Sequence, residues 1–122
     1  MSDIRGIGVD LCGISRMETL TENESFLQRC FDKEECEYIR SKGSSSAQTL
    51  AGMFAAKEAV LKAFGLGLTL SMRNVHIRHS PLGQPQVRLD GKAASLGGRI
   101  LLSVSHEGDT AAAFALWQTE EE

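Results

Sequence analysis

The segment Leu50–Gly67, LAGMFAAKEAVLKAFGLG, limits the possible folds of this chain more than any other stretch. Its length and residue types, without proline, predict a single helix. Gly65 and Gly67 are expected to end it, and Ser44–Ser46 and Thr49 offer N-caps before it. On a helical wheel one broad arc is apolar and the opposite side carries only alanines. Since a helix that is apolar all round is a buried helix, the rest of the chain must pack around it.

Three charged residues interrupt this apolar helix. Lys57 lies inside the apolar arc, whereas Glu58 and Lys62 lie together on one flank, four residues apart. A buried charge is costly unless it is paired or bound to a ligand. On an ordinary amphipathic helix Glu58 and Lys62 would be an exposed pair worth about 0.3–0.5 kcal/mol. Because this helix has almost no solvated face, we interpret the charges as part of a site.

Length and composition indicate one domain, residues 1–122, of a soluble protein. No apolar run approaches the ~20 residues of a membrane span, and the N-terminal residues lack the pattern of a secretory signal. The three cysteines, Cys12, Cys30 and Cys36, are odd in number and lack CxxC spacing. They are therefore expected to be reduced thiols of a cytoplasmic protein rather than a disulfide framework or a zinc site.

The net charge of −3 conceals a basic middle region. Residues 51–106 carry seven Lys or Arg against two Asp or Glu. An anionic ligand or partner is plausible there. The excess of basic residues is explained equally well by scattered, solvated side chains that bind no ligand.

The stretch Ile4–Cys12 alternates as a strand does. One face is apolar, with Ile7, Val9 and Leu11, and the other is nearly bare, with Gly6, Gly8, Asp10 and Cys12. Another backbone or a ligand can approach the bare face closely. Asp10, near the strand's end, is either the N-cap of the next turn or a metal ligand, and the pattern alone leaves both open.

The other expected elements are short. They are a helix or turn at Gly13–Leu20, one or two helices in Asn23–Arg40 with a capping box at Asp32–Glu35, a mobile loop at Ser41–Gln48, a hairpin of Asn74–His79 and Gln86–Leu89 around a Pro81–Pro85 turn, a helix at Lys92–Leu96, a hairpin of Ile100–His106 and Thr110–Trp117, and a frayed tail at Glu120–Glu122.

Histidines are few. His76 and His79 are interpreted as ordinary strand surface, because no third residue at metal-ligand spacing lies nearby. His106 ends its strand on the same face as Leu102 and Val104. A lone histidine there is usually structural.

Together, Asp10, Glu58 and His106 offer two carboxylates and one imidazole, a set that suits Mg²⁺. Lysines beside such an ion would neutralise the phosphate charge that develops on a leaving group. This chemistry is that of phosphoryl-type transfer from a polyphosphate donor. The spacing does not identify the donor.

Four motifs in order resemble a known family. They are Gly6-Ile-Gly-Val-Asp10 followed by Arg16, then Phe54-Ala-Ala-Lys-Glu-Ala59 with Lys62-Ala-Phe-Gly65, then Gly83-Gln-Pro85, and finally Ser103-Val-Ser-His106. On these motifs the chain is similar to the holo-[acyl-carrier-protein] synthases, the short, single-domain 4′-phosphopantetheinyl transferases. The similarity runs from Ile7 to about Leu116.

The resemblance implies an α+β fold of the 4′-phosphopantetheinyl transferase type, with a small antiparallel sheet wrapped against a long buried central helix. It also implies a homotrimer whose active sites are shared between neighbouring subunits. The reaction would move 4′-phosphopantetheine from coenzyme A to a serine of an apo acyl carrier protein in fatty acid biosynthesis, releasing adenosine 3′,5′-bisphosphate. Neither nucleic acid nor a membrane is an expected partner.

The same resemblance implies roles for individual residues. Asp10 and Glu58 would hold Mg²⁺, Lys62 would stabilise the leaving bisphosphate, and Arg16 would meet the acidic carrier. The catalytic set would be Glu58, Lys62 and His106. Coenzyme A would be contacted by Lys57, Lys62, Gly83, Pro85, Ser105 and His106. Either a metal-bound water or a nearby carboxylate would deprotonate the serine.

The chain departs from the family pattern where the nucleotide's 3′-phosphate is expected to bind. The family usually has a basic residue at the position of Met53, lysine at that of Gln84, and often a basic or polar stretch where Ser44–Ser46 stand. Arg40, Lys42 or Arg78 would have to take over that role.

Two other functions fit the same residues. One is another Mg²⁺-dependent enzyme acting on a nucleotide or phosphoester. The other is a non-catalytic oligomeric binding protein in which Lys57, Glu58 and Lys62 form an interface network.

Overall fold

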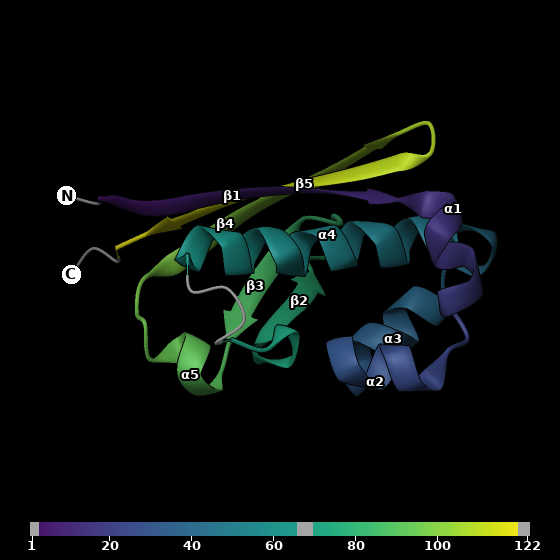
Figure 1. The fold of residues 1–122 in the computed structure, drawn as a ribbon, viewed down its shortest axis with the longest axis horizontal. Helices are drawn as coiled ribbons and strands as arrows, with labels where there is room; N and C mark the ends of the chain where they lie inside the picture. Colours follow the sequence, from purple (N-terminus) through teal and green to yellow (C-terminus); the bar gives the residue numbers. More distant parts are fainter. Residues whose placement is uncertain (1–2, 66–69, 120–122) are drawn as a thin grey trace.

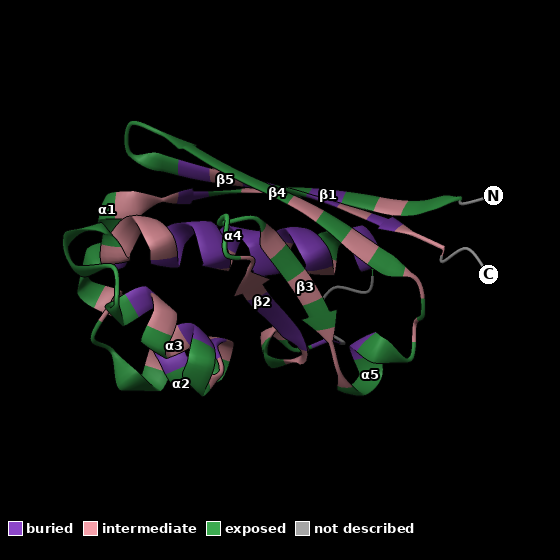
Figure 2. Cartoon of the chain, turned by 180° about the vertical axis from the view of Figure 1, so that it is seen from behind, coloured by how far each residue is buried: buried purple, intermediate pink, exposed green. Residues whose placement is uncertain are grey.

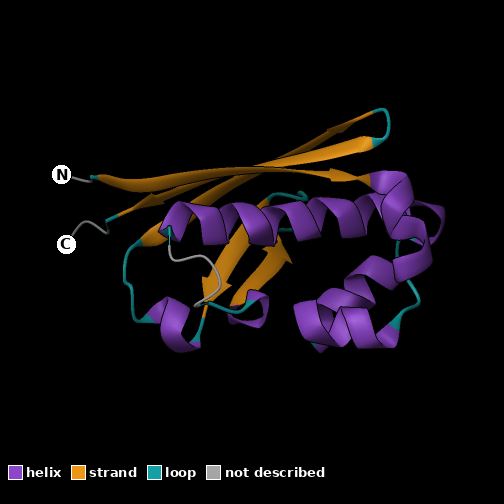
Figure 3. Cartoon of the chain, in the orientation of Figure 1, coloured by secondary structure: helices purple, strands orange, loops and turns teal. Residues whose placement is uncertain are grey.

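The computed structural model describes residues 3–65 and 70–119. A three-stranded antiparallel sheet lies on one side of a long central helix, and a two-stranded hairpin and shorter helices lie on the other (Figures 1 and 3). The elements are β1 (Ile4–Gly13), α1 (Ile14–Met17), η1 (Glu18–Leu20), α2 (Glu24–Cys30), α3 (Lys33–Arg40), η2 (Gly43–Ser45), α4 (Ser46–Phe64), η4 (Met72–Asn74), β2 (Val75–His79), β3 (Pro85–Leu89), α5 (Gly91–Ala94), β4 (Arg99–Glu107) and β5 (Thr110–Gln118). The expected α+β arrangement around a buried helix is confirmed.

The central helix α4 is the most continuously buried element (Figure 2). Eleven of its 19 residues are buried, Lys57 among them, as its wheel predicted. It ends at Gly65, whose φ of 72° is the left-handed conformation that glycine adopts easily. Gly67 lies outside the described residues.

The helix begins four residues earlier than expected, at Ser46 rather than Leu50. The prediction of a mobile loop over Ser41–Gln48 is therefore wrong. Gly43–Ser45 form a 3₁₀ turn, and the Ser46 hydroxyl donates to the Ile39 carbonyl at 2.9 Å, which fixes α4 to α3. Ser45 is the N-cap, but its side chain caps no amide.

The bare face of β1 lies directly on α4, so of the two possibilities left open by its glycines it is a backbone that approaches. A Cβ on Gly8 would lie 2.0 Å from the Ala59 carbonyl oxygen, and one on Gly6 would lie 2.0 Å from that of Ala63. Strand β5 lies between β1 and β4 and also turns small side chains inward: Ala111, Ala113 and Ala115. Backbone contact between helix and sheet therefore depends on small residues from both strands.

The opposite face of the sheet is apolar and exposed. On β1, Ile7, Val9 and Leu11 are 61%, 58% and 67% exposed, and Leu101 of β4 and Phe114 of β5 are also exposed. Val9 lies opposite Phe114 in the register. A contiguous apolar patch of this kind marks an interaction surface.

The remaining elements largely match the sequence. The capping box is present, because Asp32 accepts from the Glu35 amide at 2.8 Å and Glu35 accepts from the Asp32 amide at 2.8 Å. Both hairpins form as predicted, and all three cysteines are free. The tail Glu120–Glu122 lies outside the described residues. Within residues 3–65 and 70–119 no helix is long and apolar enough to cross a bilayer.

Candidate functional site

Asp10 of β1 and Lys62 of α4 form an ion pair where the strand crosses the helix. The Lys62 ammonium donates to the Asp10 carboxylate at 2.8 Å and to the Val9 carbonyl at 3.1 Å. The alternative role of Asp10 as an N-cap is not observed: Gly13 is the N-cap of α1, and Asp109 accepts from the Ser15 amide at 2.8 Å.

Glu58 belongs to the same cluster. Burial and the nearby negative charge of Asp10 raise the pKa of Glu58, and the charge of Lys62 opposes this effect. Hydrogen bonding and charge attraction from Asp10 raise the pKa of Lys62. The structure thus brings together two carboxylates and one ammonium predicted to share a site.

These residues fit Mg²⁺. Two carboxylates that repel each other carry more negative charge than Lys62 alone neutralises, so a divalent cation would relieve the repulsion. Only two protein ligands are needed, because Mg²⁺ keeps waters and substrate phosphates in its shell.

A groove of about 520 Å³ adjoins Glu58. It is largely apolar, and the rings of Phe26 and Phe54 pack in it with centroids 5.8 Å apart. Its lining is Phe26, Arg29, Cys30, Phe54, Glu58, Leu61, Leu70 and Met72. Arg16, the predicted carrier contact, is exposed on the neighbouring α1.

A separate cleft of about 320 Å³ holds four of the predicted coenzyme A contacts: Gly83, Pro85, Ser105 and His106. His106 is hydrogen-bonded to Gln48 of α4 at 3.0 Å. The rest of the lining is Tyr38, Gln48, Thr49, Gly52, Met53, Ala56, Ile77, His79, Val104 and Ala111. No lysine or arginine is in this lining.

The cleft and the carboxylate cluster lie on different sides of α4. Ala56 lines the cleft and Glu58 lines the groove. Residues that are two positions apart on a helix are separated by about 200° around its axis. Within one chain, therefore, the four predicted coenzyme A contacts of the cleft do not meet the predicted metal ligands, whereas Lys62, another predicted contact, bonds directly to Asp10.

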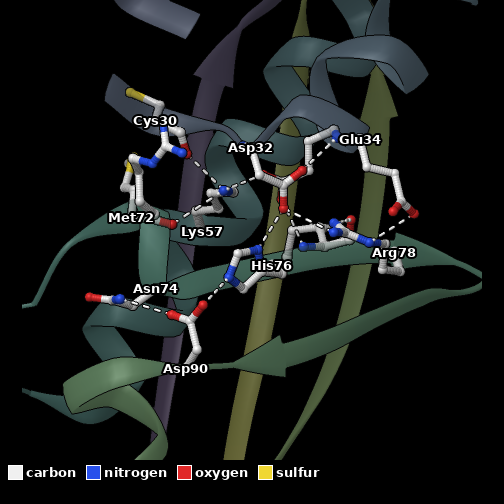
Figure 4. A network of polar contacts seen from close by, with 12 residues as sticks. Cys30, Asp32, Glu34, Lys57, Met72, Asn74, His76, Arg78 and Asp90 are labelled. Carbon is white, nitrogen blue, oxygen red and sulfur yellow. Dashed lines mark hydrogen bonds and ion pairs between the residues drawn. The ribbon is translucent and has the colours of Figure 1, made fainter. Parts of the chain in front are cut away.

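The side chain of Lys57 lines neither the cleft nor the groove. Its ammonium is fully buried and donates to the Glu35 carboxylate at 2.7 Å, to the Cys30 carbonyl at 2.7 Å and to the Met72 carbonyl at 3.2 Å (Figure 4). Burial lowers the pKa of Lys57, and the charge of Glu35 opposes this. Since three acceptors use all three protons, the prediction that Lys57 contacts phosphate is wrong. An interface network through Lys57 is excluded for the same reason.

His76 was expected on the strand surface, but it is buried between two carboxylates. Its Nδ1 lies 2.5 Å from Asp32 and its Nε2 lies 2.7 Å from Asp90 (Figure 4). Arg78 adds ion pairs of 2.9 Å to Asp32 and to Glu34. His76 alternates with the core residues Val75 and Ile77, so the strand pattern indicated a surface position, and the capping box explained Asp32 locally.

Asp32, Glu35 and His76 lie close enough to resemble a metal site. However, Glu35 already accepts from Lys57, from the Asp32 amide and from the Ile77 amide at 2.8 Å. With Lys57 and Arg78 supplying positive charge, these carboxylates have no need of a cation. We therefore assign a structural role to Asp32, Glu35 and His76.

Comparison with known proteins agrees with the fold. This chain matches the family model of the 4′-phosphopantetheinyl transferase superfamily over residues 6–115. The chain therefore belongs to this superfamily.

Within it, the chain is similar to proteins named holo-[acyl-carrier-protein] synthase. One from Geotalea daltonii is 44% identical over 119 residues, which cover 90% of this chain and 94% of that protein. One from Caldicellulosiruptor saccharolyticus is 37% identical, covering 97% and 99%. A crystal structure of the Bacillus anthracis synthase in complex with CoA (3′,5′-ADP) superimposes with a TM-score of 0.80 at 29% identity, covering 96% and 98%.

Proposed function

We propose that this protein transfers 4′-phosphopantetheine from coenzyme A to a serine of an apo acyl carrier protein, in the cytoplasm and in the service of fatty acid biosynthesis. The observation that carries the proposal is the cluster of Asp10, Glu58 and Lys62 on the buried helix and the strand against it. The names of the similar proteins support the substrate, and the CoA complex of one of them supports the donor.

In this reaction the serine oxygen forms a bond to the phosphorus that bears pantetheine, and the bond from that phosphorus to the bridging oxygen breaks. Adenosine 3′,5′-bisphosphate leaves, and the serine proton passes to water or to a carboxylate of the cluster. Asp10 and Glu58 would hold Mg²⁺, which supplies charge neutralisation at the pyrophosphate. Lys62, beside them, stabilises the charge of the leaving bisphosphate.

The active protein is proposed to be a homotrimer. The cleft with His106 and the cluster with Glu58 lie on different sides of α4, so a neighbouring copy is needed to bring one against the other. The exposed apolar face of the sheet offers a surface for such copies. Each site would combine the cleft of one chain with the carboxylates of the next.

Lys42 is proposed to hold the 3′-phosphate of coenzyme A. Of the three basic candidates, Arg40 is paired with Glu24, and Arg78 with Asp32 and Glu34. Lys42 has no carboxylate partner among residues 3–65 and 70–119. Its ammonium lies 4.5 Å from the ring centroid of Tyr38, which stacks on His79 at 4.2 Å; both rings line the cleft.

The proposal is tested by incubating the protein with coenzyme A, Mg²⁺ and an apo acyl carrier protein, and then weighing the carrier by mass spectrometry. We expect a gain of one phosphopantetheine group, which a chelator prevents. Glu58→Ala should keep its unfolding midpoint but lose about 100-fold or more in turnover, because a site carboxylate is gone. No mass gain on several carriers, with folded protein, would overturn the proposal.

A further inference from the structure

The ammonium of Lys57 is a junction between four segments. It belongs to α4 and bonds to Cys30 at the end of α2, to Glu35 of α3 and to Met72 at the start of η4. Figure 4 shows Lys57 with its bonds to Cys30 and Met72, next to the network of Asp32 and His76. No buried side-chain nitrogen or oxygen in the described parts of the chain lacks a hydrogen-bond partner. The junction is therefore fully satisfied.

Two of the three acceptors are wall residues of the groove beside Glu58. Cys30 stands in one wall and Met72 in another, and both offer backbone carbonyls to Lys57. Lys57 directly precedes Glu58 on α4. The same turn of α4 thus places the Glu58 side chain in the groove, while the Lys57 side chain bonds to the backbone of two residues that line it.

Glu35 supplies the countercharge and extends the junction. One oxygen accepts from Lys57 and from the Asp32 amide, and the other accepts from the Ile77 amide of β2. Both members of the pair are fully buried. Well-packed apolar residues of similar volume are often as stabilising as a buried ion pair, so stability alone is a weak explanation for one. A methionine could fill the space of Lys57 but could not bond to two carbonyls.

We propose that Lys57 is a positioning residue, which holds the Cys30 and Met72 walls of the groove in place relative to Glu58 while Glu35 neutralises it. The consequence for turnover rests on the proposed transferase function. The consequence for wall order and for divalent-ion binding does not.

The test compares Glu35→Gln with the double variant Glu35→Gln/Lys57→Met. Both lack the carboxylate, so they differ only in the ammonium that bonds the walls. The double variant contains no unpaired buried charge and should unfold at a denaturant concentration at or above that of the single variant. Should either variant fail to fold, Lys57→Arg, which keeps the charge and its donors, is compared with Lys57→Met.

Three measurements follow: hydrogen exchange of the amides in residues 28–31 and 71–74, Mn²⁺ binding by electron paramagnetic resonance, and steady-state kinetics. Relative to Glu35→Gln, the double variant should exchange faster at both walls and bind Mn²⁺ more weakly. Its kcat should fall about 10- to 100-fold, as expected for a misplaced site, with the KM for coenzyme A within about threefold.

Ser46→Ala is the matched control, because it removes another bond from α4 to a backbone carbonyl, that of Ile39, and neither residue lines the groove. It should lose stability but keep wall exchange and Mn²⁺ binding. Equal wall exchange and Mn²⁺ binding in the double and single variants would overturn the positioning role. If even the wild-type protein fails to modify a carrier, the proposed function falls, while exchange and Mn²⁺ binding still decide the role of Lys57.

Discussion

Asp32 illustrates how strongly a single side chain of this protein depends on its neighbours. Burial acts to raise the pKa of Asp32, but hydrogen bonds from the Glu35 amide, from His76 and from Arg78 outweigh it and lower the pKa to about 2. A carboxyl group with a depressed pKa stabilises the fold only while it is ionised.

Asp32 should therefore contribute stability above about pH 4, near its ordinary pKa of 3.8, and lose that contribution as the pH falls toward 2. The shift corresponds to about 2 kcal/mol at neutral pH. An asparagine side chain in its place would still cap α3, so Asp32→Asn should be less stable than wild type at pH 7, with most of that gap closed at pH 2.5. Urea unfolding at both pH values measures this. A gap between the two proteins that is the same at both pH values would contradict it.

Lys42→Ala tests the proposed 3′-phosphate contact. The KM for coenzyme A should rise about tenfold, since a charge-assisted contact is worth roughly 1.5 kcal/mol. The KM for 3′-dephospho-coenzyme A should not change, because that donor lacks the phosphate. Lys33→Ala, with the same change of charge at the start of α3, is the control. An equal rise with both donors would show that Lys42 does not meet this phosphate.

At the scale of residues, the sequence could predict a contact only where the local pattern of side chains determines it. Asp10 and Lys62 meet because a strand with a bare face must approach a helix. The partner of Lys57 could not be predicted in this way. Glu35 lies 22 residues away, and its position in the capping box already explained it locally. Only the packing of α3 against α4 reveals that the same carboxylate has a second role.

At the scale of elements, the approach of β1 to α4 fixes the distance between Asp10 and Lys62. This approach depends on Gly6 and Gly8, whose positions leave no room for a side chain. The hydrophobic pattern predicted both elements, and the glycines predicted that another backbone or a ligand would approach the strand closely. It did not predict where α4 begins, because serines serve equally well in loops, in caps and in a first helical turn.

Gly8→Ala should destabilise the fold by about 3 kcal/mol or more, since the new Cβ would lie 2.0 Å from the Ala59 carbonyl oxygen and strand or helix must move. Gly13→Ala is the control on the same strand. Its backbone is extended and the nearest atom to a new Cβ is 3.8 Å away, so the change should stay within about 0.5 kcal/mol. Chemical unfolding compares the two. Equal losses would show that the strand does not rest on the helix backbone.

At the scale of the whole molecule, the chain places its two candidate site regions on different sides of one helix and leaves an apolar sheet face exposed. The sequence could supply the residues of each region, because motifs are local. It could not show that one chain keeps the regions apart, since that depends on which way each residue of α4 points once the sheet and the β2–β3 hairpin have packed on it.

The split site is tested most directly by mixing two inactive variants, Glu58→Gln and His106→Ala. They are unfolded and refolded together, their assembly state is checked by sedimentation, and carrier modification is followed by mass spectrometry. In a cyclic trimer with random assortment, about a quarter of the sites would combine an intact cleft from one chain with an intact Glu58 from the next. We predict that the mixture recovers about that fraction of wild-type activity, while each variant refolded alone stays inactive. A mixture no more active than its components, despite normal assembly, would contradict the shared site.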